Sequence, residues 1–202
     1  IDGGMGSDVL EFSFPYHWQH AWNSYWTRYE SEFSLNLSQA SLSGIETLRI
    51  SGDGSNTTPA FITMTADQLN AFTRLENVRG VKLVGGGTVD LAAFTAKGGV
   101  NLTFGDDAGY TLLGGTGDDV ITDTAGNDQL IGGLGNDQLT SVAGSDVLRG
   151  GAGDDQLIIA NKSAVTDQIQ GGVGYDRLII QGSDVDLSQA SISGIEKIDV
   201  AA

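Results

Sequence analysis

The stretch GGTGDDVIT DTAGNDQLI GGLGNDQLT SVAGSDVLR GGAGDDQLI, residues 114–158, divides into five consecutive nonapeptides that each carry an aspartate at the sixth position. After a looser stretch ending in TDQIQ (166–170), the same frame returns in GGVGYDRLI (171–179). Each of these segments also carries an aliphatic residue at a fixed place near its end, two positions after the aspartate. Side chains alternate between the two faces of a strand, so one aliphatic residue with flanking Val, Gln, Thr or Arg predicts a very short strand with one buried face. The aliphatic residues are Ile121, Leu130, Leu139, Leu148, Leu157, Ile169 and Leu178.

The first six residues of each nonapeptide are expected to form a turn that binds a cation. Glycine permits positive φ angles and the close approach of backbone carbonyls, which a Cβ would obstruct. Calcium binds about six to eight oxygen ligands, and such a loop offers carbonyl oxygens together with the aspartate carboxylate. The chain has no cysteine and only two histidines, so thiolate or clustered imidazole ligands for other metals are missing. The turns therefore predict calcium sites.

The segments follow the pattern G-G-x-G-x-D-x-U-x, where U is a large aliphatic residue, and resemble the repeats-in-toxin (RTX), hemolysin-type calcium-binding family. The resemblance implies an all-β fold, a right-handed parallel β-roll or β-helix solenoid with calcium in its nonapeptide loops. It also implies a bacterial protein exported by type I secretion, and hence a secreted or extracellular location, with or without attachment to the cell surface.

Successive nonapeptides should lie on opposite edges of such a solenoid, so loops two motifs apart share an edge. The first edge holds the four complete loops, and we expect about three calcium sites between their consecutive aspartates. These aspartates are Asp119, Asp137, Asp155 and Asp176. The glycines that shape these loops are Gly115, Gly117, Gly133, Gly135, Gly151, Gly153, Gly172 and Gly174. A solvated acidic surface is the simpler alternative, but four complete motifs in one frame argue against it.

The second edge holds Asp128, Asp146 and Asp167 in loops that begin with DT, SV and SA instead of paired glycines. An insertion, residues 160–165, also precedes Asp167. We therefore expect this edge to bind calcium weakly, with one further site between Asp128 and Asp146.

Charge and composition restrict the partners of the chain. Its 202 residues include 30 glycines and only two prolines, and its formal net charge is −16. Ten aspartates between residues 114 and 176 face only two basic residues, and such crowding opposes a compact state unless cations neutralise it. The same charge argues against nucleic acid or an anionic membrane as a partner. No apolar stretch is long enough for a transmembrane helix, so we expect no membrane insertion.

A second internal repeat spans the chain. LNLSQASLSGIETLRI (35–50) matches VDLSQASISGIEKIDV (185–200), and each copy follows an RTX motif, GGMGSDVLE (3–11) or GGVGYDRLI (171–179). This indicates a tandem array, and because the chain starts inside a repeat and stops just after a strand, we expect it to be part of a larger protein.

We divide the chain into five segments. They are a partial RTX repeat (1–11), an aromatic helical insertion (12–34), a β-rich solenoid segment (35–113), the calcium-binding β-roll (114–180) and the start of a further unit (181–202). Whether 35–104 continues the solenoid or forms a separate sandwich stays open. Thr65 and Gln68 form a capping box that predicts a short helix. Tyr110 takes the aspartate position in a coil, within 96–113, that we expect to lack calcium.

The aromatic insertion is expected to form one short helix with an aromatic face. We favour packing of this face against the solenoid; the alternative is a platform for carbohydrate or a surface protein. Its candidate ligand-binding residues are Trp18, Trp22, Tyr25, Trp26 and Tyr29. A zinc site at His17 and His20 is disfavoured, because no third imidazole or cysteine exists.

Catalytic motifs are missing: the sequence contains no G-x-S-x-G, P-loop or H-E-x-x-H pattern. We therefore expect no enzymatic activity from this segment. Two functions remain, a calcium-stabilised structural module of an adhesin or surface-layer-like protein, and the C-terminal RTX portion of an exported enzyme or toxin whose active domain lies elsewhere. The tandem LSQAS-x-SGIE unit favours the first.

Overall fold

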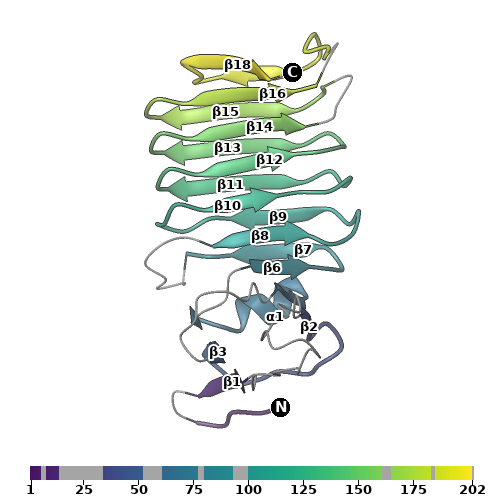
Figure 1. Ribbon diagram of the computed structural model, residues 1–202, viewed down its shortest axis with the longest axis vertical. Helices are drawn as coiled ribbons and strands as arrows, with labels where there is room; N and C mark the ends of the chain where they lie inside the picture. The colour runs from purple at the N-terminus through teal and green to yellow at the C-terminus, as the bar shows by residue number, and fades with distance from the viewer. Residues whose placement is uncertain are drawn as a thin grey trace, which may run out of the picture.

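Parallel strands stacked in register organise the computed structural model, which describes residues 1–5, 8–13, 34–51, 61–76, 80–92, 100–160, 165–182 and 185–201 (Figure 1). The larger of two long sheets has nine strands. In spatial order they are β2 (Ser34–Asn36), β4 (Phe61–Met64), β6 (Gly80–Leu83), β8 (Asn101–Phe104), β10 (Val120–Thr122), β12 (Gln138–Ser141), β14 (Gln156–Ala160), β16 (Arg177–Gln181) and β18 (Lys197–Ala201).

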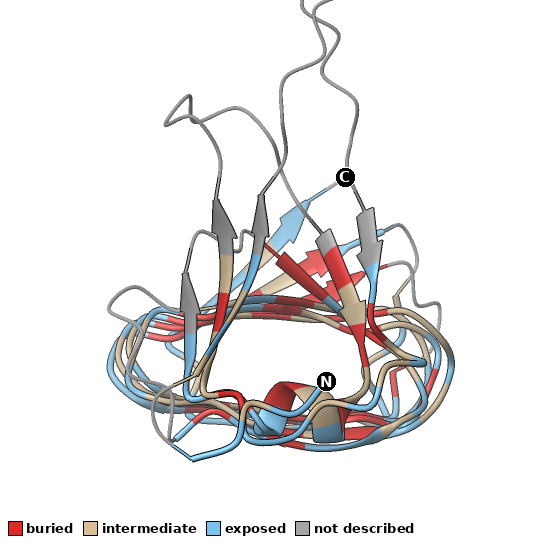
Figure 2. Ribbon diagram, turned by 90° about the horizontal axis from the view of Figure 1, so that it is seen from below, coloured by how far each residue is buried: buried red, intermediate tan, exposed pale blue. Residues whose placement is uncertain are grey.

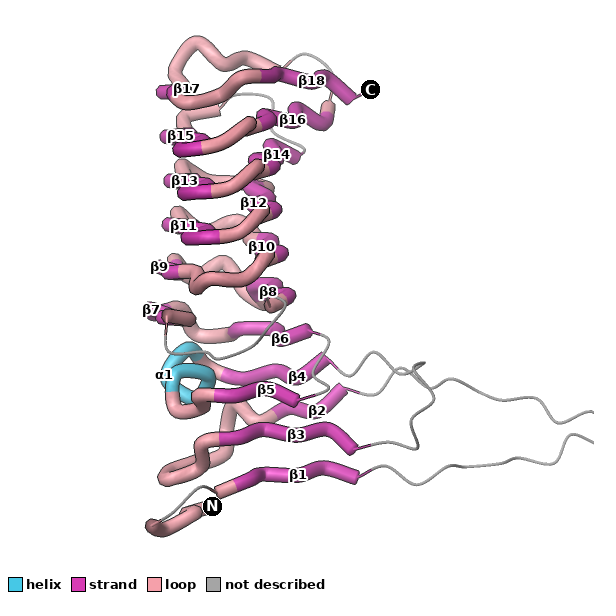
Figure 3. The backbone as a smooth tube through the Cα atoms, turned by 90° about the vertical axis from the view of Figure 1, so that its left-hand side faces the viewer, coloured by secondary structure: helices cyan, strands magenta, loops and turns pink. Residues whose placement is uncertain are grey.

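The second long sheet has six strands, and a short sheet of three strands lies at the N-terminal end. The six are β7 (Gly87–Asp90), β9 (Tyr110–Leu113), β11 (Gln129–Leu134), β13 (Val147–Ala152), β15 (Gln168–Val173) and β17 (Ser191–Ser193). The three are β1 (Val9–Ser13), β3 (Thr47–Ser51) and β5 (Arg74–Glu76). From β6 onward the chain alternates between the two long sheets, so each coil contributes one strand to each (Figure 3). The predicted all-β parallel solenoid is confirmed.

The two long sheets enclose a narrow core of stacked, mostly aliphatic side chains. Register places Ile121 beside Leu139, Leu139 beside Leu157, and Leu157 beside Leu178 in the larger sheet. In the smaller sheet Leu112, Leu130, Leu148 and Ile169 form the equivalent column. All of these side chains are at most 1% exposed, and Figure 2 shows the coils superimposed as a flattened ring. The aliphatic residue two positions after each repeat aspartate therefore lies in the core, as predicted.

The stretch before residue 105 continues this solenoid, which answers the question that the sequence left open. Strands β2, β4, β6 and β8 belong to the same sheet as β10–β18. The only helix in the described part of the chain is α1 (Ala66–Asn70), which has the predicted capping box of Thr65 and Gln68. The Asn70 side chain hydrogen bonds to the backbone of Thr88 and Asp90, so α1 covers the edge of β7. No described helix is long and apolar enough to cross a membrane.

The aromatic insertion predicted for 12–34 is corrected at its ends. Residues 12 and 13 belong to strand β1 and residue 34 begins strand β2, because both ends of the segment extend sheets of the solenoid. Residues 14–33, with all the aromatic candidates and both histidines, lie outside the described residues.

The core column predicts a large cost for its interruption. Leu139→Ala should lower the free energy of unfolding by about 2–5 kcal/mol, because Leu139 is fully buried and its neighbours are fixed by the sheets. Leu134 lies in the same repeat but is 55% exposed, and Leu134→Ala should cost less than about 0.5 kcal/mol. Urea denaturation in saturating calcium measures both, and equal losses would contradict the assigned core.

Candidate metal centre

Buried aspartates on the first edge of the solenoid are joined in a continuous ladder. The backbone N–H of Asp119 donates to Oδ1 of Asp137 (2.8 Å), that of Asp137 to Asp155 (2.8 Å), and that of Asp155 to Asp176 (2.9 Å). These four residues are at most 3% exposed. The structure therefore brings the four predicted first-edge aspartates together, one in each coil, at the turns that precede β10, β12, β14 and β16.

The second carboxylate oxygen of the inner aspartates is the feature that indicates a metal. Oδ2 of Asp137 and Oδ2 of Asp155 are buried without a hydrogen-bond partner in the described part of the chain. A Cβ on Gly132 would overlap Asp137 Oδ2 and the carbonyl oxygen of Gly150, and a Cβ on Gly150 would overlap Asp155 Oδ2 and the carbonyl oxygen of Gly171. Each glycine thus allows a carboxylate oxygen and a carbonyl oxygen to approach its Cα closely from two successive coils. Buried unpartnered carboxylates are costly, and oxygen-lined spaces fit calcium.

The first loop, residues 114–119, has a different geometry. The backbone N–H of Gly115 donates to Oδ2 of Asp119 at 3.5 Å, so the second oxygen of this aspartate has a partner within its own loop. Gly115 also has no positive φ. In the later loops the glycines at the second and fourth positions have positive φ: Gly133, Gly135, Gly151, Gly153, Gly172 and Gly174. The arrangement around Asp137 and Asp155 is therefore shared, whereas the predicted site between Asp119 and Asp137 is built differently.

Burial and mutual repulsion change the acidity of the ladder. Burial first, and then the neighbouring carboxylates, raises the pKa of Asp137 to about 7 and that of Asp155 to about 6. The pKa values of Asp119 and Asp176 are raised for the same main reason, burial. The backbone N–H donors oppose this shift but do not cancel it. Ionisation of these carboxylates is therefore less favourable than that of a free aspartate, and a nearby divalent cation would favour the ionised form.

The second edge carries a matching ladder. Oδ1 of each aspartate on this edge accepts a backbone N–H from the coil below, at 2.7–2.9 Å: Asp128 from Tyr110, Asp146 from Asp128, and Asp167 from Asp146. Asp167 therefore joins the ladder despite the insertion that precedes it.

A cluster of three buried carboxylates lies on this second edge. Asp123, Asp128 and Asp146 each place a ligand oxygen within 4.8 Å of the others. Sequence reasoning missed Asp123, because the DT that opens its loop was interpreted as lost glycines. The signal was present: the aspartate stands where the other loops have their first glycine, and it adds a carboxylate.

At the lower end of the second edge, the ladder position itself holds no carboxylate. Tyr110 occupies the aspartate position, is 2% exposed, and stacks on Phe104 with ring centroids 4.1 Å apart. Its hydroxyl donates to Oδ1 of Asp106 at 2.6 Å, and burial together with this bond raises the pKa of Tyr110. The hydroxyl of Tyr110 and the carboxylate of Asp106 are therefore paired with each other within this coil.

The family model described as the RTX calcium-binding nonapeptide repeat (4 copies) matches residues 111–139 and 139–158. The matched residues include the first-edge ladder from Asp119 to Asp155 and the second-edge ladder from Asp128 to Asp146. The chain therefore carries RTX calcium-binding repeats. No curated protein and no solved structure matches the chain. RTX repeats form calcium-binding structural modules, and the unpartnered carboxylate oxygens of Asp137 and Asp155 lie within the matched repeats.

The raised pKa values predict how the calcium-free RTX module responds to acid. An aspartate whose pKa is raised on folding stabilises the fold at low pH, and this contribution is lost as pH rises through about 7 for Asp137. Circular dichroism of calcium-stripped protein should show more β-structure at about pH 5.5 than at about pH 8. Asp137→Asn should reduce the difference, whereas Asp107→Asn, which removes an exposed carboxylate, should not. More β-structure at the higher pH would contradict the prediction.

Proposed function

We propose that this RTX module is a calcium-dependent spacer in a secreted or cell-surface bacterial protein of adhesin or surface-layer type, and that it folds when it meets calcium after export. The observation that carries the proposal is the row of buried Oδ2 atoms at Asp137 and Asp155, which have no hydrogen-bond partner among the described residues. Proteins with RTX repeats are typically exported by type I secretion, from a cytoplasm where free calcium is scarce.

The energetics of calcium binding suit such a switch. Extracellular calcium modules commonly have dissociation constants of ~10⁻⁴–10⁻³ M. At a free calcium concentration about tenfold above that constant, each site adds roughly 1.4 kcal/mol to the folded state, and three sites add about 4 kcal/mol. The free energy of unfolding of a domain is only about 5–15 kcal/mol. Without calcium this contribution vanishes and the repulsion of the buried carboxylates remains.

We assign about three sites to the first edge, as its four aspartates imply, and one to the second edge. The second-edge site uses Asp123 in addition to Asp128 and Asp146. Asp123 is 2% exposed and its Oδ1 accepts a hydrogen bond from the backbone of Val142 at 2.6 Å, so the carboxylate is held in place. This third carboxylate supports a stronger site than the degenerate loops alone suggest.

The alternative context is the RTX portion of an exported enzyme or toxin. The duplicated LSQAS-x-SGIE unit favours the spacer, because it makes the chain one unit of an array. A catalytic or pore-forming domain encoded beside this segment would favour the alternative. We assign no catalytic residue, since the buried carboxylates serve the ladder. The aromatic segment stays a candidate surface for carbohydrate or a surface protein, through Trp22 and Trp26 among others.

A calcium titration tests the proposed folding switch. Starting from calcium-stripped protein, circular dichroism should show a cooperative gain of β-structure at ~10⁻⁴–10⁻³ M calcium. Magnesium at the same concentration should give no such gain, because it requires a small octahedral site and gives up its water reluctantly. Asp137→Ala should shift the midpoint to higher calcium. If the calcium-stripped protein is fully folded and binds no calcium, the proposal fails.

The second-edge site predicts a specific loss. Asp123→Asn should remove one bound calcium per chain, measured by equilibrium dialysis at the calcium concentration that just saturates the wild type. The substitution keeps the size of the side chain and the acceptor for Val142, so the fold should remain. Asp107→Asn is the matched control on the surface. Unchanged stoichiometry in Asp123→Asn would confine calcium to the first edge.

A further inference from the structure

Both copies of the LSQAS-x-SGIE element end in a glutamate that accepts the backbone N–H of the aspartate in the preceding RTX motif. The backbone N–H of Asp176 donates to Oε2 of Glu196, and that of Asp8 donates to Oε2 of Glu46, each at 2.7 Å. The corresponding bond between two calcium loops runs from Asp155 to Asp176 at 2.9 Å. Glutamate therefore stands where a further RTX loop would place its aspartate.

The glycine of the same element supplies the second oxygen of the site. A Cβ on Gly171 would overlap both Asp176 Oδ2 and the carbonyl oxygen of Gly194. This repeats the arrangement at Gly150, where the two oxygens come from Asp155 and from Gly171 of the next loop. The Gly194 carbonyl thus takes the place of the leading-glycine carbonyl of a calcium loop.

The N-terminal copy repeats the arrangement in its described residues. A Cβ on Gly3 would overlap the carbonyl oxygen of Gly44, with Asp8 beside it. Gly44 and Gly194 have nearly the same positive φ, 62° and 61°. Two segments far apart in the sequence therefore place the same carbonyl against the same loop position.

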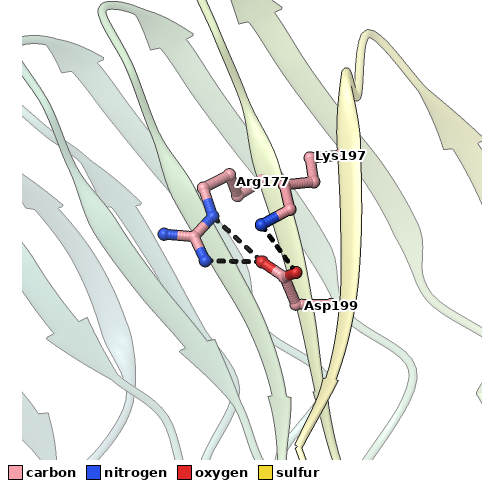
Figure 4. Close-up of polar contacts among 3 residues, drawn as sticks. All are labelled: Arg177, Lys197 and Asp199. Atoms are coloured by element: carbon pink, nitrogen blue, oxygen red, sulfur yellow. Dashed lines mark hydrogen bonds and ion pairs between the residues drawn. The ribbon is translucent and has the colours of Figure 1, made fainter.

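The carboxylate of Asp176 is buried and only partly hydrogen bonded. Asp176 is 0% exposed, and its Oδ2 has no hydrogen-bond partner in the described part of the chain. The basic residues next to Asp176 and Glu196 in the sequence, Arg177 and Lys197, are both paired with Asp199 (Figure 4). The side chains of Arg177 and Lys197 therefore pair with Asp199, which lies outside the ladder.

We propose that each SGIE turn completes a terminal calcium site, in which the Gly194 carbonyl and the Glu196 carboxylate act with Asp176, and Gly44 and Glu46 act with Asp8. The inference rests on calcium binding by the RTX loops and extends it to a turn without the nonapeptide motif. Calcium accepts carboxylate and carbonyl oxygens in flexible geometry, so this donor set suits it.

The length of the turn explains the glutamate. The SGIE turn passes from Gly194 to Glu196 in three residues, whereas the calcium loop below it takes six, from Gly171 to Asp176. The extra methylene of glutamate lets its carboxylate reach the ladder from this shorter turn. In the N-terminal copy the next coil, at Thr73 and Arg74, donates its backbone N–H groups to the Glu46 carbonyl at 2.8 and 3.1 Å. The carboxylate ladder therefore ends at the glutamate while the backbone ladder continues.

Calcium counts in Glu→Gln variants of the full chain test the proposal. Glu196→Gln keeps an oxygen acceptor for Asp176 N–H but removes the charge, and the Arg177–Asp199 pair still ties β18 to β16. At the calcium concentration that just saturates the wild type, equilibrium dialysis should give one bound ion fewer in Glu196→Gln. Glu46→Gln should also lose one ion, and the double variant two. Circular dichroism in calcium should confirm that all three remain folded.

Two controls separate this proposal from the general calcium-binding function. Glu11→Gln removes an exposed carboxylate that pairs with Arg49 at 3.8 Å, and its calcium count should equal that of the wild type. Asp137→Asn should lose calcium at the RTX loops. If Asp137→Asn loses calcium while Glu196→Gln and Glu46→Gln keep the full count, the terminal sites are refuted and the RTX function stands. If the wild type binds no calcium, both fail.

Discussion

The carboxylates of Asp137, Asp155 and Asp176 each perform two tasks, and the rest of the RTX module depends on this division. Oδ1 of Asp155 accepts the backbone N–H of Asp137 in the coil below, which fixes the spacing of the turns. Oδ2 of the same residue lies against the leading glycine, where a metal can bind. Because a strand of only three to six residues follows each turn, the turn geometry sets the register of both long sheets. The hydrogen bonds and the metal therefore act on the same atoms that align the core.

Burial of the ladder carboxylates lowers the stability of the folded state. The aliphatic columns around Leu139 and Leu130 favour the stacked state by burial, but the aspartates of the ladder are buried at the adjacent turns. The raised pKa values of Asp137 and Asp155 express how strongly the ionised ladder is disfavoured without a cation. Apolar burial is nearly independent of calcium, whereas the carboxylate cost is removed by it. The proposed calcium dependence therefore arises at the turns, since the described core cluster is made of apolar side chains.

Much of this arrangement could be predicted from the sequence, because the period of nine fixes both the core residue and the aspartate. Leu139 and Asp137 needed only their place in the repeat. Asp123 was missed because a carboxylate replaced a glycine and looked like a lost motif. Glu196 and Gly194 could not be recognised, since SGIE is shorter than a calcium loop and its match to one appears only when the coils are stacked. The repeat predicts what recurs, and contacts between unlike coils require the structure.

The ends of the ladders show that the array has a direction. At the lower ends, the backbone N–H groups of Val100 and Tyr110 donate to Asp119 and Asp128 without offering a carboxylate of their own. At the upper end of the first edge, Glu196 offers a carboxylate without a six-residue loop. In each ladder the backbone N–H of one coil donates to the carboxylate of the coil above. The lowest coil needs to supply only a backbone N–H, whereas the N–H of the topmost aspartate needs an acceptor from the coil above it. Glu196 supplies this acceptor above Asp176, and Glu46 supplies it above Asp8, so both copies of the SGIE turn close an RTX motif in the same way.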